Sequence, residues 1–282
     1  MVVGVERLGH GPKNGGTGSA FCRAVLHAPG VVVVIPCYNE AERLSEAQVL
    51  ALVGHPGVDV LLVDDGSSDG TAALLERISQ KAPVGRARSM ILPENRGKAE
   101  AVRAGMLAAL EGGASIVGYA DADFATPPEE IVHLQSELER SGALVALGAR
   151  IARLGAHIDR KASRHYLGRV FATGASLVLG LAVYDTQCGA KLFRDTPALR
   201  HALRDPFSSR WAFDVELIGR LTAGGPGVPP IAPAEMIEVP LRTWIDVGGS
   251  KLSARGAVKA GLDLMALGAR VARRGPRGFF PR

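Results

Sequence analysis

The sequence places two carboxylates one residue apart, Asp121 and Asp123, directly after the apolar run 115–120. A short apolar run of this kind indicates a buried strand, so both carboxylates are expected at a strand end. Carboxylate oxygens are ligands that Mg²⁺ and Mn²⁺ prefer, and these ions usually keep water and substrate phosphates in their shell. The pair therefore predicts a site for Mg²⁺ or Mn²⁺ and a diphosphate substrate, although Asp-x-Asp is also common in ordinary turns.

Three other polar segments have the same kind of position. Pro36-Cys37-Tyr38-Asn39-Glu40 follows the run 31–35, and Asp64-Asp65-Gly66-Ser67 follows the run 58–63. Gly97-Lys98 stands at the start of a predicted helix, where backbone N–H groups and a lysine suit a phosphate. The chain has neither GxxxxGK[ST] nor a GxGxxG after its first strand, which argues against an ATPase phosphate loop and a dinucleotide dehydrogenase.

The elements that must position these residues alternate along the chain. Strands are expected at 31–35, 58–63, 88–92, 115–120 and 144–148, and helices at 40–53, 70–80, 97–110 and 127–140, with Thr126 as N-cap of the last. This alternation predicts an α/β fold with a mostly parallel central sheet and helices on both faces. Ligands of such sheets gather at the carboxyl ends of the strands, where the polar segments stand.

The charge of the chain is concentrated at its end. Lysine and arginine number 33 against 28 acidic residues, a net charge of +5. Residues 251–282 hold eight basic residues and one acid, so the rest of the chain is nearly neutral. This distribution argues against a nucleic-acid binder. Three cysteines without a CxxC pair favour a reducing compartment.

No apolar run reaches the roughly 18–20 residues that a membrane-spanning helix needs. The run 171–183 is expected to be a core or interfacial helix. We expect three parts: a mobile, glycine-rich tail at 1–29, one catalytic domain at 30–250, and a basic, partly amphipathic segment at 251–282. The oligomeric state stays open at this point.

Several longer sequence segments resemble those of a known protein family. The segments VVVVIPCYNEAERL, VLLVDDGSSDGT, ENRGKAEAVRAGM and YADAD resemble the nucleotide-sugar half of family-2 glycosyltransferases, which have the Rossmann-like GT-A fold. DTQCGAKLF at 185–193 and RWAFDVEL at 210–217 are more specific and resemble the dolichyl-phosphate β-glucosyltransferase branch of that family. The resemblance spans about residues 31–265.

The resemblance implies transfer of glucose, with inversion, from UDP-glucose to a polyprenyl phosphate. It assigns residues to the nucleoside pocket: Pro36, Tyr38, Glu40, Val63 and Asp65. It assigns Asp121 and Asp123 to the metal and diphosphate, Ala122 to the space between them, and Lys251 to the diphosphate. A carboxylate at position 65 also suits the imide N–H of uracil, because a carboxylate only accepts hydrogen bonds.

The acceptor side needs cations because the nucleophile is a phosphate. By resemblance, Arg150 and Arg164 clamp that phosphate through charge-assisted hydrogen bonds, and Asp185 lies near the reaction centre. A phosphate is already ionised at neutral pH, so a strong base is not obligatory. The competing interpretations are that the two arginines are surface residues and that Asp185 caps the turn before Gly189.

Three alternatives remain: another nucleotide sugar, such as that of mannose or GlcNAc; a soluble acceptor; or a nucleotide-sugar-binding module without catalysis. Trp244-Ile245-Asp246 stands where mannosyl relatives carry an arginine, which favours glucose. The basic segment is expected to contact an anionic membrane surface, placing the protein peripherally on the cytoplasmic face. The competing interpretation is a helix packed on the domain with a solvated basic face.

Overall fold

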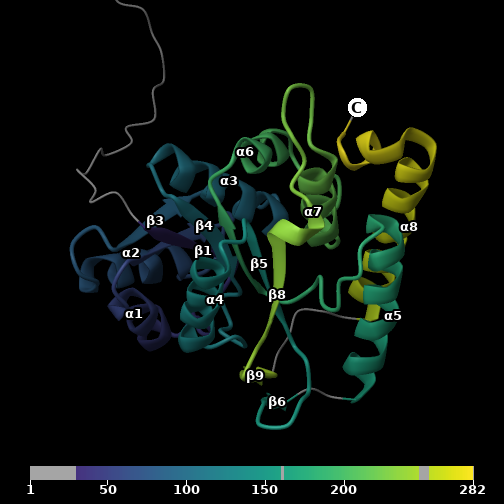
Figure 1. Cartoon of the computed structure of the whole chain (residues 1–282). Helices are drawn as coiled ribbons and strands as arrows, with labels where there is room; N and C mark the ends of the chain where they lie inside the picture. Colours follow the sequence, from purple (N-terminus) through teal and green to yellow (C-terminus); the bar gives the residue numbers. More distant parts are fainter. Residues whose placement is uncertain (1–29, 160–161, 248–253, 282) are drawn as a thin grey trace, which may run out of the picture.

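The computed structural model describes residues 30–159, 162–247 and 254–281. Its centre is a seven-stranded sheet, flanked by helices (Figure 1). Six strands run in one direction and β7 runs in the other; five of the six are β3 (Ala87–Ile91), β2 (Val58–Asp64), β1 (Val31–Cys37), β4 (Ile116–Ala120) and β5 (Val145–Ala149). The order is β3-β2-β1-β4-β7-β5-β8, and β8 (Met236–Pro240) pairs in parallel with β5. This arrangement confirms the predicted α/β fold with a mostly parallel sheet.

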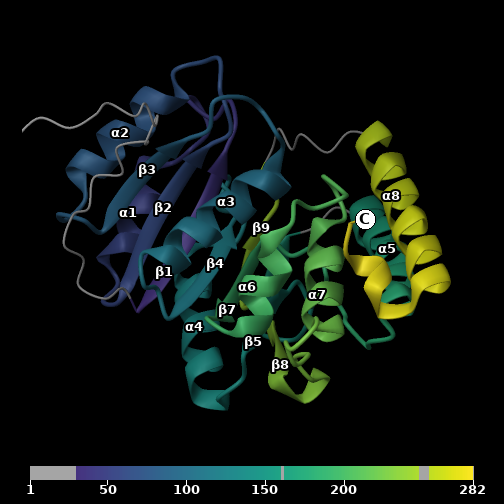
Figure 2. The same cartoon turned by 90° about the horizontal axis from the view of Figure 1, so that it is seen from above.

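Helices cover both faces of the sheet (Figure 2). The helices α1 (Glu46–Gly54), α2 (Thr71–Lys81) and α4 (Pro128–Ser141) pack on one face. The helices α3 (Lys98–Glu111), α6 (Pro197–Arg204) and α7 (Phe213–Ala223) pack on the other. Because successive side chains of a strand point to opposite faces, the continuous valine run of β1 supplies both cores.

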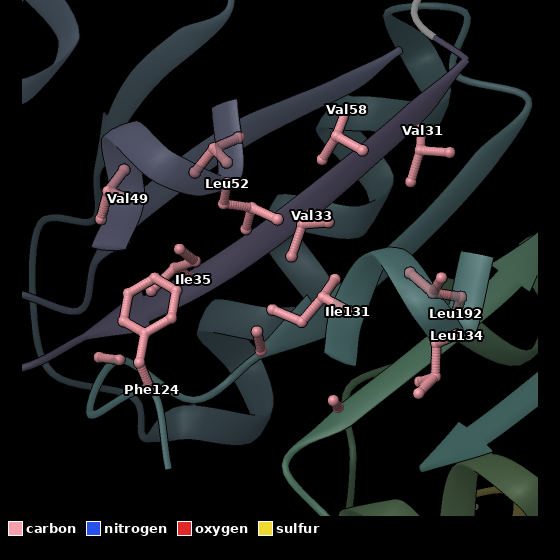
Figure 3. Packing of buried hydrophobic residues seen from close by; sticks show 14 of the residues in the cluster. Val31, Val33, Ile35, Val49, Leu52, Val58, Phe124, Ile131, Leu134 and Leu192 are labelled. Atoms are coloured by element: carbon pink, nitrogen blue, oxygen red, sulfur yellow. The ribbon is translucent and has the colours of Figure 1, made fainter. Parts of the chain in front are cut away.

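The core under α1 and α4 shows this alternation directly. Val33 and Ile35 of β1 point toward Leu52 of α1 and Ile131 of α4 (Figure 3). The intervening Val32 and Val34 of β1 belong to the opposite cluster, beneath α3. A strand buried on both faces is held firmly in register, so the residues at its carboxyl end have defined positions.

The strand β7 (Ala190–Arg194) is antiparallel to both of its neighbours, β4 and β5. It was not among the expected strands, because its short sequence AKLFR has no clear period. Its register places Ala190 opposite Ala120, the last residue of β4. The segment before β7 therefore lies at the same sheet edge as the carboxyl ends of the parallel strands.

All four predicted helices begin later than expected, the first by six residues and the other three by one. The first helix begins at Glu46 instead of residue 40, because Ser45 caps it by accepting a hydrogen bond from the Gln48 amide at 3.4 Å. The preceding segment forms a turn, in which Asn39 has a φ of +50°. In α4 the N-cap position is Pro127, one residue after the expected Thr126.

Two long helices lie side by side at one end of the molecule, α5 (Ala162–Leu179) and α8 (Ala254–Arg274), as Figures 1 and 2 both show. A third cluster joins them to α7 and to the 3₁₀ helix η2 (Gly275–Phe279); it includes Ala175, Val215, Leu264, Leu267 and Phe279. None of the described helices is long and apolar enough to cross a membrane.

The remaining described elements are short. A second sheet consists of β6 (His157–Asp159) and β9 (Thr243–Ile245), which pair in parallel. A 3₁₀ turn, η1 (Pro233–Glu235), leads into β8.

The substitution Leu52→Ala should lower the free energy of unfolding by about 2–5 kcal/mol, because it opens a cavity in a core where Leu52 is fully buried. Urea denaturation followed by circular dichroism measures this change. The control Val84→Ala, at a fully exposed side chain, should change the free energy by less than about 0.5 kcal/mol. Equal effects of the two substitutions would contradict the packing described for this core.

Candidate active site

The candidate site lies at the edge of the sheet where the parallel strands end and β7 begins. Asp65 follows β2, Asp121 and Asp123 follow β4, and Arg150 follows β5. Asp185 precedes the antiparallel strand β7. The topology thus brings together five predicted residues that are up to 120 positions apart in the chain.

Asp65 is buried and fixes the start of α3. Its two carboxylate oxygens accept hydrogen bonds from the backbone N–H groups of Arg96 at 2.9 Å and Gly97 at 2.7 Å. Burial raises the pKa of Asp65, while these N–H groups and the charge of Arg210 oppose that effect. The carboxylate therefore joins β2 to the helix α3 and keeps further lone pairs for a ligand.

The other predicted nucleoside residues surround the ends of β1 and β2. Pro36 lies in β1, and Tyr38 follows it with 39 % of its surface exposed. The backbone of buried Glu40 donates to the Thr71 hydroxyl at 2.8 Å, which ties this loop to α2. Val63 is completely buried beneath α3, so its side chain supports this region as part of the core.

Asp121 forms an ion pair with Lys98, which stands at the start of α3. Burial would lower the pKa of Lys98, but the carboxylates of Asp121 and Asp214 raise it overall. The opposite side of Asp121 rests on Gly189, where an added Cβ would overlap its carboxylate. The Gly189 carbonyl also accepts the Asp121 backbone N–H at 3.0 Å, so this residue holds both the backbone and the side chain of Asp121 in place.

Asp123 accepts a hydrogen bond from the Ala125 backbone at 3.1 Å, and buried Ala122 separates it from Asp121. Burial and the negative charge of Asp121 raise the pKa of Asp123. Two oxygen-donor carboxylates fit a hard divalent cation that completes its shell with water and phosphates, and a cation would offset their repulsion. Within the described segments, no cluster of three or more acidic, His or Cys side chains forms a closed metal cage.

Arg150 and Asp185 form a two-pronged ion pair. The Nε and Nη2 of Arg150 donate to the two Asp185 oxygens at 2.7 and 2.8 Å, and the Arg150 backbone N–H donates at 3.2 Å. Burial alone would raise the pKa of Asp185, but Arg150 lowers it to about 2. Asp185 is therefore an ionised partner of Arg150 at neutral pH. It also accepts the Gln187 N–H at 3.1 Å, so the turn-capping interpretation describes part of its role.

Two residues that support this pair escaped the sequence analysis. Glu238 of β8 accepts the backbone N–H groups of Tyr184 and Asp185 at 2.8 and 2.9 Å. Trp244, noted earlier only as a departure from mannosyl relatives, places its ring 5.4 Å from the Arg150 guanidinium. Position 238 gave no signal because an acid in an edge strand is ordinary.

Lys191 lies completely buried behind the site. It donates to the Cys188 carbonyl at 2.6 Å and to Asp214 at 2.7 Å, and Asp214 also accepts the Tyr119 hydroxyl. These contacts join the segment 185–193, with the sequence DTQCGAKLF, to the segment 210–217, with the sequence RWAFDVEL. Tyr119 of β4 contacts Asp214 of the second segment. These contacts fix the turn that carries Asp185 and Gly189, and they assign Asp214 to Lys191.

Two predicted residues are not placed. Lys251 lies outside the described residues. Arg164 falls in α5, but its side chain is outside the part of the chain that the structure describes. The remaining predicted residues lie at the sheet edge, with Val63 beneath it.

A mostly parallel α/β sheet with an Asp-x-Asp pair at the end of β4 is the arrangement that the resemblance to glycosyltransferases predicts, and comparisons with known proteins agree. The model of "Glycosyl transferase family 2" matches residues 32–200, so the chain belongs to this family. The chain is similar to dolichyl-phosphate beta-glucosyltransferase of Drosophila melanogaster, with 34% identity over 78% of this chain and 68% of that protein. It is also similar to polyprenol monophosphomannose synthase of Mycolicibacterium smegmatis, with 31% identity over 79% of this chain and 80% of that protein.

Solved structures support the fold. Glucosyl-3-phosphoglycerate synthase from Mycobacterium tuberculosis, crystallised with Mn²⁺, UDP-glucose and phosphoglyceric acid, has a TM-score of 0.56 and 16% identity. The match covers 84% of this chain and 79% of that one. Together with the family match, this likeness confirms the predicted GT-A fold and the classification as a glycosyltransferase.

The substitution Asp185→Asn should destabilise the protein at pH 7, because it leaves the buried Arg150 charge without its partner. The loss of stability should become smaller as the pH falls. Because the pKa of Asp185 is lowered in the folded protein, its contribution to stability is present above its ordinary pKa of 3.8 and disappears toward pH 2. Urea denaturation from pH 7 to pH 3 should show the stabilities of the two proteins converging by about 1 kcal/mol over this range. A pH-independent difference would contradict the ion pair.

Proposed function

We infer that this glycosyltransferase transfers glucose from UDP-glucose to a polyprenyl phosphate, giving a β-glucosyl phospholipid and UDP. The observation that carries the inference is the presence, at one sheet edge, of a carboxylate pair suited to a metal–diphosphate and of a partly buried arginine suited to a phosphate acceptor. The name of the Drosophila relative supports this assignment over 78% of the chain.

The donor would occupy the carboxyl ends of β1, β2 and β4. We assign its uridine to Pro36, Tyr38, Glu40 and Asp65, with Val63 beneath them. Asp121 and Asp123 would hold Mg²⁺ or Mn²⁺, with Ala122 between them and Lys98 and Lys251 toward the diphosphate. When bound, the cation supplies Lewis-acid stabilisation of the negative charge that develops on the departing diphosphate.

Lys98, at the start of helix α3, would place a positive charge near the diphosphate. In the structure its ammonium group pairs with Asp121, and the Phe213 ring lies 5.9 Å away. A diphosphate at this edge offers Lys98 a second anionic partner close to its present one. The same lysine would thus hold Asp121 and contact the donor.

The acceptor phosphate would meet Arg150 and, by resemblance, Arg164. One phosphate oxygen attacks C1 of glucose from the face opposite the UDP group, the bond from C1 to the diphosphate oxygen breaks, and UDP leaves with the electron pair. A single displacement of this kind inverts C1. Because Asp185 is paired and strongly acidic, it orients Arg150, and the already ionised phosphate needs no base.

The choice of glucose over mannose rests on the acceptor side of the site. Trp244 belongs to the segment 244–246, where by resemblance mannosyl relatives carry an arginine, and its ring lies 5.4 Å from the Arg150 guanidinium. An arginine added beside Arg150 would place two like charges side by side. The M. smegmatis relative keeps a mannosyl donor as the alternative that must be tested.

Incubation of the protein with radiolabelled UDP-glucose, polyprenyl phosphate and Mn²⁺ should move label into the lipid phase. Asp123→Asn should lower kcat about 10²–10³-fold because it removes stabilisation of the leaving diphosphate. The matched control Glu129→Gln, at an exposed carboxylate of α4, should keep full activity. Label in a water-soluble glycoside would indicate a soluble acceptor, and transfer from GDP-mannose alone would indicate a mannosyl donor. UDP binding without turnover would indicate a binding module. Each of these results would contradict the proposed reaction.

The lipid acceptor also requires contact with a membrane surface, which we assign to the pair α5–α8 at the cytoplasmic face. Leu262 and Met265 of α8 and Val170 and Leu177 of α5 are exposed apolar side chains. Exposed cations, including Lys259 and Arg273, stand on α8. Such a surface suits anionic headgroups. The same helix also packs on the domain through Leu264 and Leu267, as the competing interpretation expected, and the membrane contact of its outer face stays a proposal.

Removal of residues 270–282 is a poor test of this contact, because Phe279 is buried and its carbonyl accepts a hydrogen bond from Arg220. The double substitution Leu262→Ser and Met265→Ser leaves the core intact and should weaken co-sedimentation with anionic vesicles about tenfold. Val84→Ser, far from this end, should bind vesicles like the wild type. Unchanged binding of the double variant would exclude this surface.

A further inference from the structure

Arg210 is a charged residue beside the donor site that the assignments above leave without a role. It stands in the segment between α6 and α7, more than one hundred positions from Asp65 and Gly97. Its side-chain stem lies along Gly97, where an added Cβ would be 3.2 Å from the Arg210 Cδ and 3.4 Å from its Nε. The positive φ of Gly97, +94°, and the close arginine both disfavour a larger residue there.

The head of Arg210 is available to a ligand. Within the part of the chain that the structure describes, the guanidinium forms no hydrogen bond and no ion pair, and the residue is exposed. Its positive charge is close enough to Asp65 to oppose the rise in the pKa of that buried carboxyl group. The planar guanidinium of Arg210 therefore adds five N–H donors to the sheet edge beside the Asp65 carboxylate.

The segment that carries Arg210 is held by buried groups. Glu216 of α7 accepts the backbone N–H groups of Ser208 and Ser209 at 3.0 and 3.3 Å. The Ser209 hydroxyl accepts the N–H groups of Trp211 and Ala212 at 3.1 and 2.7 Å. The backbone on both sides of Arg210 is therefore fixed before any ligand arrives.

A buried arginine completes this anchor. Arg220 donates to Glu216 at 2.7 Å and to the Pro206 carbonyl at 2.8 Å, with none of its surface exposed. Phe213, the first residue of α7, packs its ring 5.7 Å from Tyr119 of β4. The position of Arg210 relative to the sheet edge is thus set by the core, a condition for directional recognition.

We propose that Arg210 determines nucleobase specificity, by donating a hydrogen bond to a carbonyl oxygen of the uracil whose imide N–H is accepted by Asp65. The inference rests on the proposed UDP-glucose donor and extends it. Uracil presents one N–H between two carbonyl oxygens along one edge, so it needs one acceptor and neighbouring donors. Asp65, which accepts the Gly97 N–H, and Arg210, whose stem lies along Gly97, together supply that combination.

Guanine fits the same pair less well. Its corresponding edge presents one carbonyl oxygen and then two adjacent N–H donors, so an amino group stands where uracil has its second carbonyl oxygen. The Asp65 carboxylate, which also accepts the backbone N–H groups of Arg96 and Gly97, supplies an acceptor for the ring N–H of either base. An arginine that donates to the second uracil carbonyl would meet the guanine amino group with its own N–H donors, and unpaired polar groups of this kind discriminate between ligands.

Isothermal titration calorimetry with UDP, uridine and GDP, at constant Mn²⁺, tests the proposal. For Arg210→Met, affinity for UDP and for uridine should fall by the same factor, about 10- to 100-fold, whereas affinity for GDP should change less than about threefold. Arg210→Lys keeps the charge but loses the planar fork, so its UDP affinity should stay at least about fivefold below the wild type.

Arg204→Met is the matched control, since it removes an exposed charge paired only with Asp205 among the described residues, and it should bind UDP normally. Thermal unfolding checks that each variant is folded. Equal losses for UDP and GDP, or a loss for UDP without one for uridine, would show a phosphate contact and overturn the proposal. Full recovery in Arg210→Lys would also overturn it. If the wild-type protein binds GDP more tightly than UDP, that result would instead contradict UDP-glucose as the donor.

Discussion

The whole candidate site depends on the antiparallel strand β7 between β4 and β5. Its pairing places Ala190 opposite Ala120, and the Asp121 backbone donates to Gly189 at 3.0 Å. Only this direction of the chain brings the segment before β7 to the edge where the parallel strands end. The carboxylate pair of β4 and the ion pair formed by Arg150 and Asp185 therefore become neighbours, and donor and acceptor sites can share one centre.

Charges at this edge are organised by how deeply they are buried. Arg150 with Asp185, Lys191 with Asp214, and Arg220 with Glu216 are buried pairs, in which each charge is satisfied by its partner and by backbone groups. Buried pairs of this kind contribute little net stability, but breaking one is costly. Their effect is to fix loops, which leaves the more exposed charges at the rim, such as Lys98 and Arg210, to meet a ligand.

The far end of the molecule is joined to the site through the same segment. Arg220 donates to the carbonyl of Phe279 in η2, and the Ser209 hydroxyl donates to Asp263 of α8 at 2.7 Å. The helix that we assign to the membrane surface is thus hydrogen-bonded to the segment that carries Arg210. A lipid-bound phosphate and a soluble nucleotide sugar could meet at one centre only if these two regions keep a fixed relation.

The sequence by itself determined the alternation of strands and helices, because apolar runs, caps and turn residues are local signals. It also located Asp65, Asp121 and Asp123, since polar residues after buried strands must lie at one edge of a parallel sheet. It missed β7 and could not show that Arg150 binds Asp185, that Lys98 binds Asp121 or that Arg210 lies on Gly97. These contacts join residues 23 to more than 100 positions apart, and only the packing of the sheet and helices decides which of them meet.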